Sequence, residues 1–135
     1  MPEKIIVAVD FDGTLCDNDY PKAGKEHWSL IHALQELKIE GKIDLILWTC
    51  RADEDLEFAV NWCKKRGLIF DAVNENLPRV IEMYHGDTRK VSADIYIDDF
   101  AKSYDDLSDY SLGTVSWIRN IIMKTKPHHV EKEKK

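Results

Sequence analysis

Two aspartates one residue apart, Asp10 and Asp12, directly follow five small or apolar residues, Ile5 to Val9. An uninterrupted apolar run of this kind is typical of a strand that is buried on both faces of a parallel sheet. The two carboxylates repel each other where the strand ends, and neither belongs to an amphipathic pattern that would place it in solvent. Gly13 allows a positive φ or a close approach of the backbone to a ligand. The segment therefore indicates a site for chemistry rather than an ordinary acidic turn.

Polar groups also follow two later apolar runs, residues 43–48 and residues 93–97. The residues after these runs are Thr49, Cys50 and Arg51 in the first case, and Asp98 and Asp99 in the second. Strands that alternate with helices form a parallel sheet, and right-handed crossovers bring the carboxyl ends of its strands to one edge. Ligands of open α/β sheets bind at that edge. We therefore expect the three strand ends to converge on one site.

Four aspartates in one site would repel one another strongly, because two like charges ~4 Å apart cost about 4 kcal/mol at an effective dielectric constant near 20. Either some of the carboxyl groups stay protonated or a cation lies among them. Oxygen ligands favour a hard cation, and Mg²⁺ commonly takes one or two carboxylates together with water and substrate phosphate. The sequence thus predicts a Mg²⁺ site. Its candidate ligands are Asp10, Asp12, Asp98 and Asp99.

The stretch from Asp10 to Thr14 resembles the Asp-x-Asp-Gly-Thr signature of the haloacid dehalogenase-like superfamily. The resemblance extends over about residues 4–102 and includes a second motif at Thr49 and an acidic pair at Asp98. It implies a phosphatase that hydrolyses phosphomonoesters, in which Asp10 attacks phosphorus and forms an aspartyl-phosphate. It also implies that Asp12 protonates the leaving oxygen and then activates water as a general base.

The resemblance assigns the remaining groups to metal and phosphate. Asp98 would hold the metal, and Asp99 would support it directly or through water. The hydroxyl of Thr49 and the neighbouring backbone at Cys50 would hold the phosphoryl group, with bidentate contacts from Arg51.

The third motif of the superfamily is a lysine, for which Lys90 is the natural candidate. Eight residues of extended strand span roughly 26 Å, so Lys90 reaches the site only if the chain bends back before Ala93. The substitutes for it are Lys102, Arg79 and Arg51.

The pattern of elements predicts the α/β class: one Rossmann-like domain over residues 1–124, with a parallel sheet, helices on both faces and a polar tail at 125–135. Residues 27–37, 53–66 and 115–123 are expected to be helical, 68–73 to form a further strand, 17–24 to be a loop and 78–84 to hold one or two helical turns. The segment from Leu15 to Lys25 is too short for a folded cap domain. Capless members of the superfamily often act on bulky substrates such as proteins, nucleic-acid ends or large glycolipid precursors. A small sugar phosphate remains an alternative, since Tyr20-Pro21 or residues 74–76 could reach over the site.

The composition of the 135 residues restricts the partners. A net charge of −6 argues against a broad nucleic-acid-binding surface, although it leaves a single nucleic-acid end open as a substrate. No apolar run approaches the ~20 residues that a membrane span needs. Three cysteines without paired spacing favour free thiols and a cytoplasmic location. The oligomeric state is left open.

Three other functions fit parts of the pattern. A signalling receiver domain also has an acidic cluster, a hydroxyl residue and a lysine, but its adjacent acids follow the first strand, whereas here the adjacent pair comes late, at Asp98. A phosphate-binding or regulatory module could keep the site without turnover. A phosphotransferase would pass the phosphoryl group from Asp10 to an acceptor other than water, yet an open site favours hydrolysis.

Overall fold

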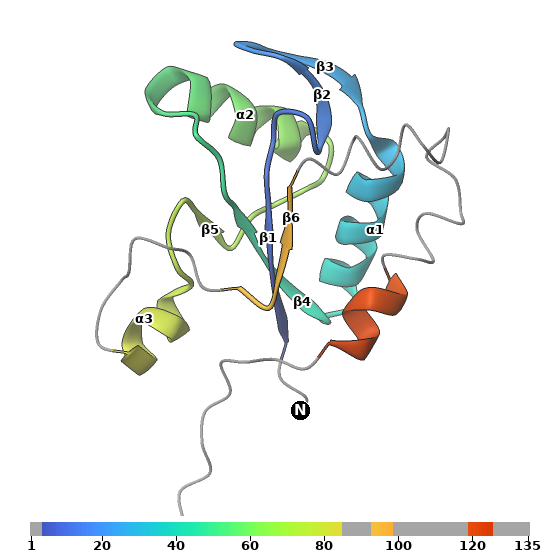
Figure 1. The fold of residues 1–135 in the computed structure, drawn as a ribbon, viewed down its shortest axis with the longest axis vertical. Helices are drawn as coiled ribbons and strands as arrows, with labels where there is room; N and C mark the ends of the chain where they lie inside the picture. The colour runs from blue at the N-terminus through green and yellow to red at the C-terminus, as the bar shows by residue number, and fades with distance from the viewer. Residues whose placement is uncertain (1–3, 85–92, 99–118, 126–135) are drawn as a thin grey trace, which may run out of the picture.

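The computed structural model of the protein describes residues 4–84, 93–98 and 119–125. At its centre lies a four-stranded parallel sheet with the strand order β5-β4-β1-β6 (Figure 1). The strands are β1 (Ile5–Val9), β4 (Ile43–Leu47), β5 (Ala72–Val73) and β6 (Ile95–Ile97). The predicted α/β class and Rossmann-like sheet are therefore confirmed.

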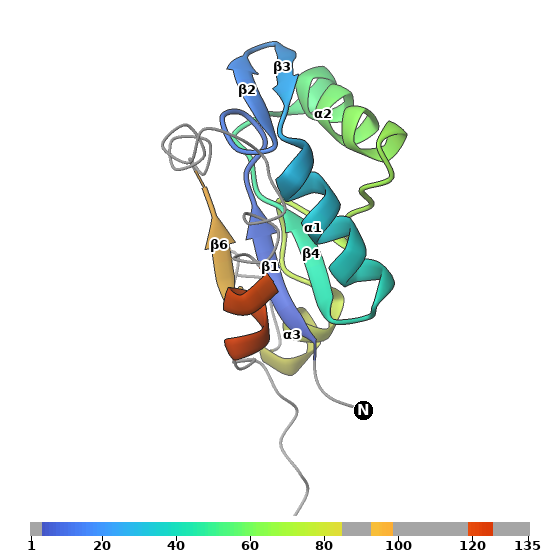
Figure 2. The same cartoon turned by 90° about the vertical axis from the view of Figure 1, so that its right-hand side faces the viewer.

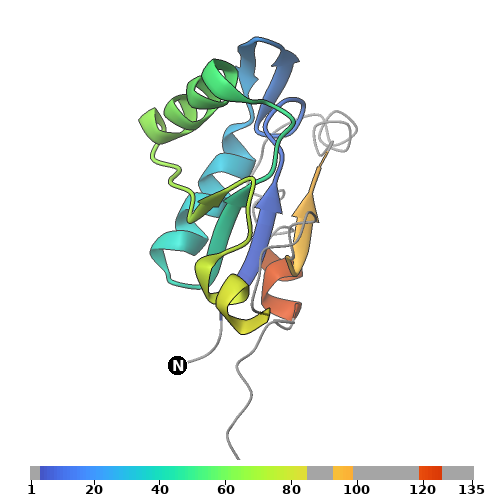
Figure 3. The ribbon, with the colours of Figure 1, turned by 90° about the vertical axis from the view of Figure 1, so that its left-hand side faces the viewer.

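Helices cover both faces of this sheet. On one face lie α1 (Trp28–Ile39), which stands in front of the sheet in Figure 2, and α2 (Asp53–Lys65). On the other face lies α3 (Pro78–Tyr84), which is seen from its own side in Figure 3. Residues 119–124 are also helical and bring Ile122 into the core beside α1. Within the described ranges, no helix has the length and apolarity that a membrane span requires.

The strand β1 is central because its side chains serve two cores at once. Val7 and Val9 pack into the core under α1 and α2, whereas Ile6 and Ala8 pack into the core under α3. These four side chains are at most 1% exposed. Full burial of an aliphatic side chain of this size contributes about 1.5–3 kcal/mol. The strand is thus buried on both faces, as predicted, and its end is held rigidly.

The prediction of a loop over residues 17–24 is wrong. The chain there forms an antiparallel hairpin of β2 (Cys16–Asp19) and β3 (Lys22–Glu26), which stands beyond the carboxyl edge of the main sheet (Figure 1). Most of its residues are polar and face solvent, so the segment carries no apolar alternation that would indicate a strand. Backbone pairing and a few long-range contacts hold it instead.

The histidine that follows β3 anchors the base of this hairpin. His27 is fully buried, and its Nδ1 lies 2.6 Å from the carbonyl oxygen of Thr14. Its Nε2 lies 2.7 Å from Oδ1 of Asp17 in β2. The imidazole therefore links the Asp-x-Asp-Gly-Thr turn, the hairpin and the start of α1.

Of the strand predicted over residues 68–73, only Ala72 and Val73 form a strand, β5. The N–H of Leu68 still donates to the carbonyl oxygen of Cys63 and completes the end of α2, after Gly67 has taken a φ of +83°. Asp71 then donates its N–H to the carbonyl oxygen of Leu45. Parallel pairing with β4 begins only at Ala72. The helix-terminating geometry delays the strand by four residues.

The other helix predictions agree with the structure where it describes them. The expected helices near 27–37 and 53–66 correspond to α1 and α2, and the short helix near 78–84 is α3. Of the closing helix expected at 115–123, residues 119–124 are helical and residues 115–118 lie outside the described part. Most of the predicted tail, residues 126–135, also lies outside it.

Candidate active site

The strand register brings three distant chain segments to one point. Val9 of β1 pairs with Leu47 of β4 on one side and with Ile97 of β6 on the other. The next residue of each strand therefore lies at the same level of the sheet edge. Asp10 confirms this alignment, because its N–H donates to the carbonyl oxygen of Ile97 at 3.0 Å. Asp10 and Asp98 are thus immediate neighbours across the sheet edge.

The carboxyl groups of Asp10 and Asp98 are hydrogen-bonded to each other. Burial, followed by this hydrogen bond and by the negative charges of Asp98 and Asp12, raises the pKa of Asp10 to about 7. The backbone N–H of Phe11 opposes this increase in the pKa of Asp10 through its own hydrogen bond. Burial and the neighbouring carboxylates therefore disfavour the ionised form of Asp10, which is the effect that the sequence predicted for crowded acids.

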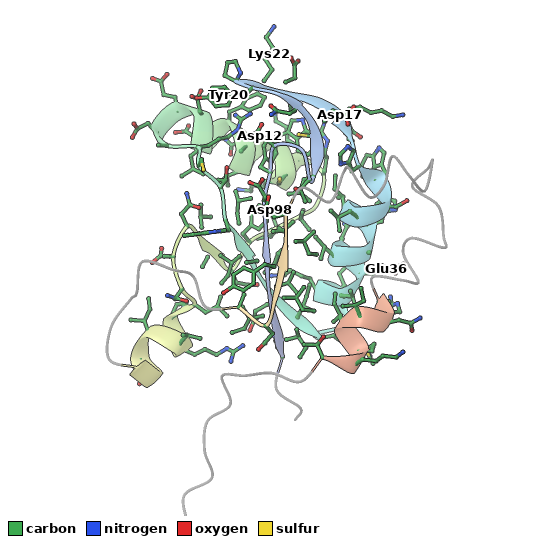
Figure 4. All side chains as sticks on the ribbon, in the orientation of Figure 1. Asp12, Asp17, Tyr20, Lys22, Glu36 and Asp98 are labelled. Carbon is green, nitrogen blue, oxygen red and sulfur yellow. The ribbon has the colours of Figure 1, made fainter. Side chains whose placement is uncertain are left out.

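The turn after Asp10 directs Asp12 away from this pair. Gly13 takes a φ of +82° and donates its N–H to the carbonyl oxygen of Cys16 at 2.9 Å. The Asp12 carboxylate accepts two hydrogen bonds of 2.8 Å from Arg51, at Oδ2 from Nε and at Oδ1 from Nη2. Figure 4 shows Asp12 above Asp98, below the hairpin that carries Tyr20.

Arg51 contacts protein groups in place of the phosphate oxygens predicted for it. Its guanidinium group donates to protein oxygens through all five of its N–H bonds, so none is left for a phosphate oxygen in this arrangement. Asp12 and Arg51 form an ion pair with each other. Each carboxylate oxygen of Asp12 accepts one of these bonds and keeps a further lone pair, so the part of Asp12 in a metal site with Asp10 and Asp98 stays a prediction.

The loop after β4 holds Thr49 at the carboxyl edge of the sheet, two residues after Leu47. Its N–H donates to Oδ1 of Asn74 at 2.8 Å, and its hydroxyl oxygen accepts the N–H of Arg51 at 3.2 Å. The hydroxyl hydrogen of Thr49 can still be donated to a ligand oxygen. Cys50, the next residue, is exposed.

Asn74 is the residue that the sequence interpretation missed as part of the site. It follows β5 directly, adopts a φ of +54°, and donates its own N–H to the carbonyl oxygen of Leu47. It therefore holds the loop that follows β4 from the neighbouring strand β5. The available signal was an asparagine at a strand end, since asparagine tolerates a positive φ and its amide can bond to nearby backbone.

Replacement of Asn74 tests this support. We expect Asn74→Gly to lower the free energy of unfolding by about 1 kcal/mol, because the N–H of Thr49 loses its acceptor. Asn74→Ala loses the same bond and also places a Cβ-bearing residue in the left-handed region, which costs about 1–2 kcal/mol more. Urea unfolding of the three proteins measures both differences. A glycine variant as stable as the wild type would show that the bond contributes nothing.

The remaining predicted cations do not add to the described site. Arg79 forms an ion pair with Asp44 at 2.9 Å, and Asp44 lies near the amino end of β4, far from the carboxyl edge. Arg79 is therefore no substitute for the expected lysine. Lys90, Lys102 and Asp99 lie outside the described residues.

A divalent cation fits the carboxyl pair by its donor chemistry. Asp10 and Asp98 offer neighbouring carboxyl oxygens, and a hard cation between them would offset the charge that disfavours ionisation of Asp10. Two protein carboxylates are the number that Mg²⁺ commonly uses when water and phosphate complete its octahedron. No group of three or more acidic, histidine or cysteine side chains in residues 4–84, 93–98 and 119–125 has the arrangement of a complete metal site.

Comparisons with known proteins identify one relative. No protein-family model matches the chain, and no curated protein matches it. Among solved structures, the chain is similar to a conserved protein coded by a locus of Bacteroides thetaiotaomicron, with 33% sequence identity and a TM-score of 0.62. The match covers 85% of this chain and 98% of the Bacteroides chain. At this identity and coverage, the chain belongs to the same family as that conserved Bacteroides protein.

Proposed function

We propose that the protein is a Mg²⁺-dependent phosphatase that hydrolyses phosphomonoesters through an aspartyl-phosphate on Asp10. The observation that carries the proposal is the hydrogen-bonded pair of Asp10 and Asp98 at the carboxyl edge of the parallel sheet. The Asp-x-Asp-Gly-Thr turn and the Thr49 hydroxyl support it, because they would supply a nucleophile and a hydrogen-bond donor for phosphate at the same edge of the sheet.

In the first step, a carboxylate oxygen of Asp10 attacks phosphorus and forms an O–P bond, while the ester O–P bond breaks and the leaving oxygen takes a proton from Asp12. Asp10 must be ionised for this attack. A bound Mg²⁺, held by Asp10 and Asp98 with Asp99 as a further candidate ligand, would supply positive charge that favours the ionised form and offsets the charge of the phosphate. The Thr49 hydroxyl would orient the phosphoryl oxygens.

In the second step, Asp12 accepts a proton from a water molecule, which attacks phosphorus and releases Asp10 and inorganic phosphate. The ion pair with Arg51 holds the Asp12 carboxylate in one orientation, which suits this step. Protonation of the leaving oxygen in the first step is the other role that the superfamily resemblance assigns to Asp12. It requires Asp12 to carry a proton while it lies beside Arg51.

The substrate that we propose is a phosphorylated molecule that can approach an open site. Within the described residues, the insertion after β1 is the small hairpin of β2 and β3 rather than a folded cap. A bulky substrate, including a phosphorylated nucleic-acid end, can therefore reach the carboxyl pair. The free thiols of Cys16, Cys50 and Cys63 support action in a reducing compartment, for which we propose the cytoplasm.

A substrate screen tests the proposed function. Purified protein is incubated with 4-nitrophenyl phosphate, phosphorylated metabolites and oligonucleotides that end in 3′- or 5′-phosphate, in Mg²⁺ or in EDTA. We expect release of inorganic phosphate in Mg²⁺ and its loss in EDTA. Absence of phosphate release from every compound in Mg²⁺ would contradict the proposal.

A second candidate is a phosphate-binding module without turnover. The ion pair between Arg51 and Asp12 favours this second candidate, because a carboxylate bound to a guanidinium group is a poor proton donor. The two candidates differ in one outcome of the screen, since a binding module would bind a phosphorylated compound without releasing phosphate from it.

A further inference from the structure

The guanidinium group of Arg51 is enclosed by protein on every side. Its side chain is 1% exposed. Two of its five N–H bonds go to the carboxylate of Asp12, as described above. The other three go to backbone carbonyl oxygens at 2.8, 2.8 and 3.1 Å, those of Pro21, Lys22 and Asp55 in that order. The group is therefore fully engaged and held in one orientation.

Three aromatic rings complete this enclosure. The guanidinium carbon lies 4.8 Å from the ring centre of Phe11, 4.9 Å from that of Tyr20 and 5.6 Å from that of Phe58. Such cation–π contacts contribute from about 0.5 to 2 kcal/mol each, depending on their exposure to water. The hydroxyl of Tyr20 also donates to Oδ2 of Asp55 at 2.5 Å, which holds the ring of Tyr20 over the cation.

The contacts of Arg51 join three parts of the fold that are distant from one another in the sequence. Pro21 and Lys22 belong to the tip of the hairpin, Asp55 belongs to α2, and Asp12 belongs to the turn after β1. Figure 4 shows Tyr20 and Lys22 at the hairpin, above Asp12. Since a buried ion pair contributes little more to stability than apolar side chains of the same volume, stability alone does not explain the arrangement.

We propose that Arg51 is a positioning residue that fixes the Asp12 carboxylate and couples it to the tip of the β2–β3 hairpin. The inference rests on the proposed phosphatase function, in which Asp12 serves the water-activating step. Its consequence is that the hairpin tip is part of the catalytic geometry. A displacement of Tyr20, Pro21 or Lys22 would move the guanidinium group, and with it Asp12.

The chain offers a matched control for this role in Arg66. Arg66 also stacks on an aromatic ring, that of Trp62 at 3.7 Å, and donates to the carbonyl oxygen of Trp62 at 2.9 Å. It also donates to Glu26 of β3 at 2.8 Å. Arg66 thus joins the same hairpin to the same helix through Glu26 and Trp62 rather than through Asp12. A change in kcat on its replacement would report the structural effect of losing such a contact.

The test compares Arg51→Lys with Arg66→Lys in the phosphatase assay. Lysine keeps the positive charge, but its single nitrogen cannot hold both oxygens of Asp12 and three carbonyl groups at once. We expect Arg51→Lys to lower kcat by about 100-fold with little change in KM, because a displacement of about 1 Å in a catalytic group has an effect of this size. We expect Arg66→Lys to change kcat less than about twofold, the range of a surface contact. Guanidinium ion added to Arg51→Ala should restore part of kcat, which a general loss of stability would not allow.

A second variant keeps the test decisive if Arg51→Lys does not fold. Tyr20→Ala removes an exposed ring that touches Arg51, so it should fold. We expect it to lower kcat about tenfold, because loss of the ring leaves the guanidinium group of Arg51 less firmly oriented. Where Arg51→Lys does fold, Tyr20→Ala should have no further effect in that background, because coupled residues are not additive. If Tyr20→Ala leaves kcat unchanged, the hairpin is not coupled to Asp12 and the inference is wrong.

The outcomes separate this inference from the function on which it rests. An active wild type with equal kcat values for Arg51→Lys and Arg66→Lys would overturn the positioning role and leave the phosphatase intact. A wild type that is inactive on every phosphomonoester would overturn both.

Discussion

Asp10→Asn lowers kcat for phosphomonoester hydrolysis by on the order of 10⁴ or more, the loss expected when the nucleophile of a concerted catalytic group is removed. The amide is close in size to the carboxyl group, but it cannot form an aspartyl-phosphate. The fold should persist, because the amide N–H can donate to Asp98. Phosphate release at saturating substrate measures the effect.

The matched control for this variant is Asp19→Asn, which removes an exposed carboxylate from β2. It changes the net charge by the same amount, and we expect it to keep full activity. Both variants should melt cooperatively. If Asp10→Asn kept a substantial part of the wild-type rate, the nucleophile would be assigned to the wrong residue.

We expect Mg²⁺ to stabilise the protein through the proposed site at Asp10 and Asp98. At a concentration 100-fold above its dissociation constant, a ligand of the native state adds about 2.7 kcal/mol to the free energy of unfolding. For a domain of this length, the Tm rises by on the order of 10 °C. Thermal unfolding in Mg²⁺ and in EDTA measures the shift.

Asp98→Asn should lose most of this shift, because it removes one of the two charged ligands, whereas Asp19→Asn should keep it. The absence of any Tm change in millimolar Mg²⁺ would contradict a cation site at Asp10 and Asp98. A shift that survives in Asp98→Asn would place the cation elsewhere.

The raised pKa of Asp10 also makes stability depend on pH in the metal-free protein. Asp10 releases its proton near its ordinary pKa of 3.8 when unfolded, but near a pKa of about 7 when folded. Between these values the folded state binds more protons, so the contribution of Asp10 to stability is complete below about 3.8 and is lost as the pH rises to about 7. Urea unfolding in EDTA across this range should show a stability difference between wild type and Asp10→Asn that becomes less favourable to the wild type with rising pH. A constant difference would contradict the raised pKa.

Local patterns were sufficient for the framework of the fold. The apolar run of β1 predicted a strand buried on both faces, because continuous apolarity in five residues is favourable only inside a covered parallel sheet. The helix predicted over residues 27–37 corresponds to α1. From these elements, topology alone placed Asp10 and Asp98 together, since the carboxyl ends of parallel strands share one edge.

The sequence thus determined which residues meet at the sheet edge, because hydrophobic periodicity and strand-end chemistry are properties of neighbouring residues. Only the tertiary structure decided how those residues pair. Arg51 binds Asp12, 39 positions away, and Asn74 holds Thr49, 25 positions away. The hairpin of β2 and β3 also depends on such contacts, since its polar residues bury little surface of their own. These pairings depend on distances and angles between separate elements of the fold, and no local sequence pattern encodes them.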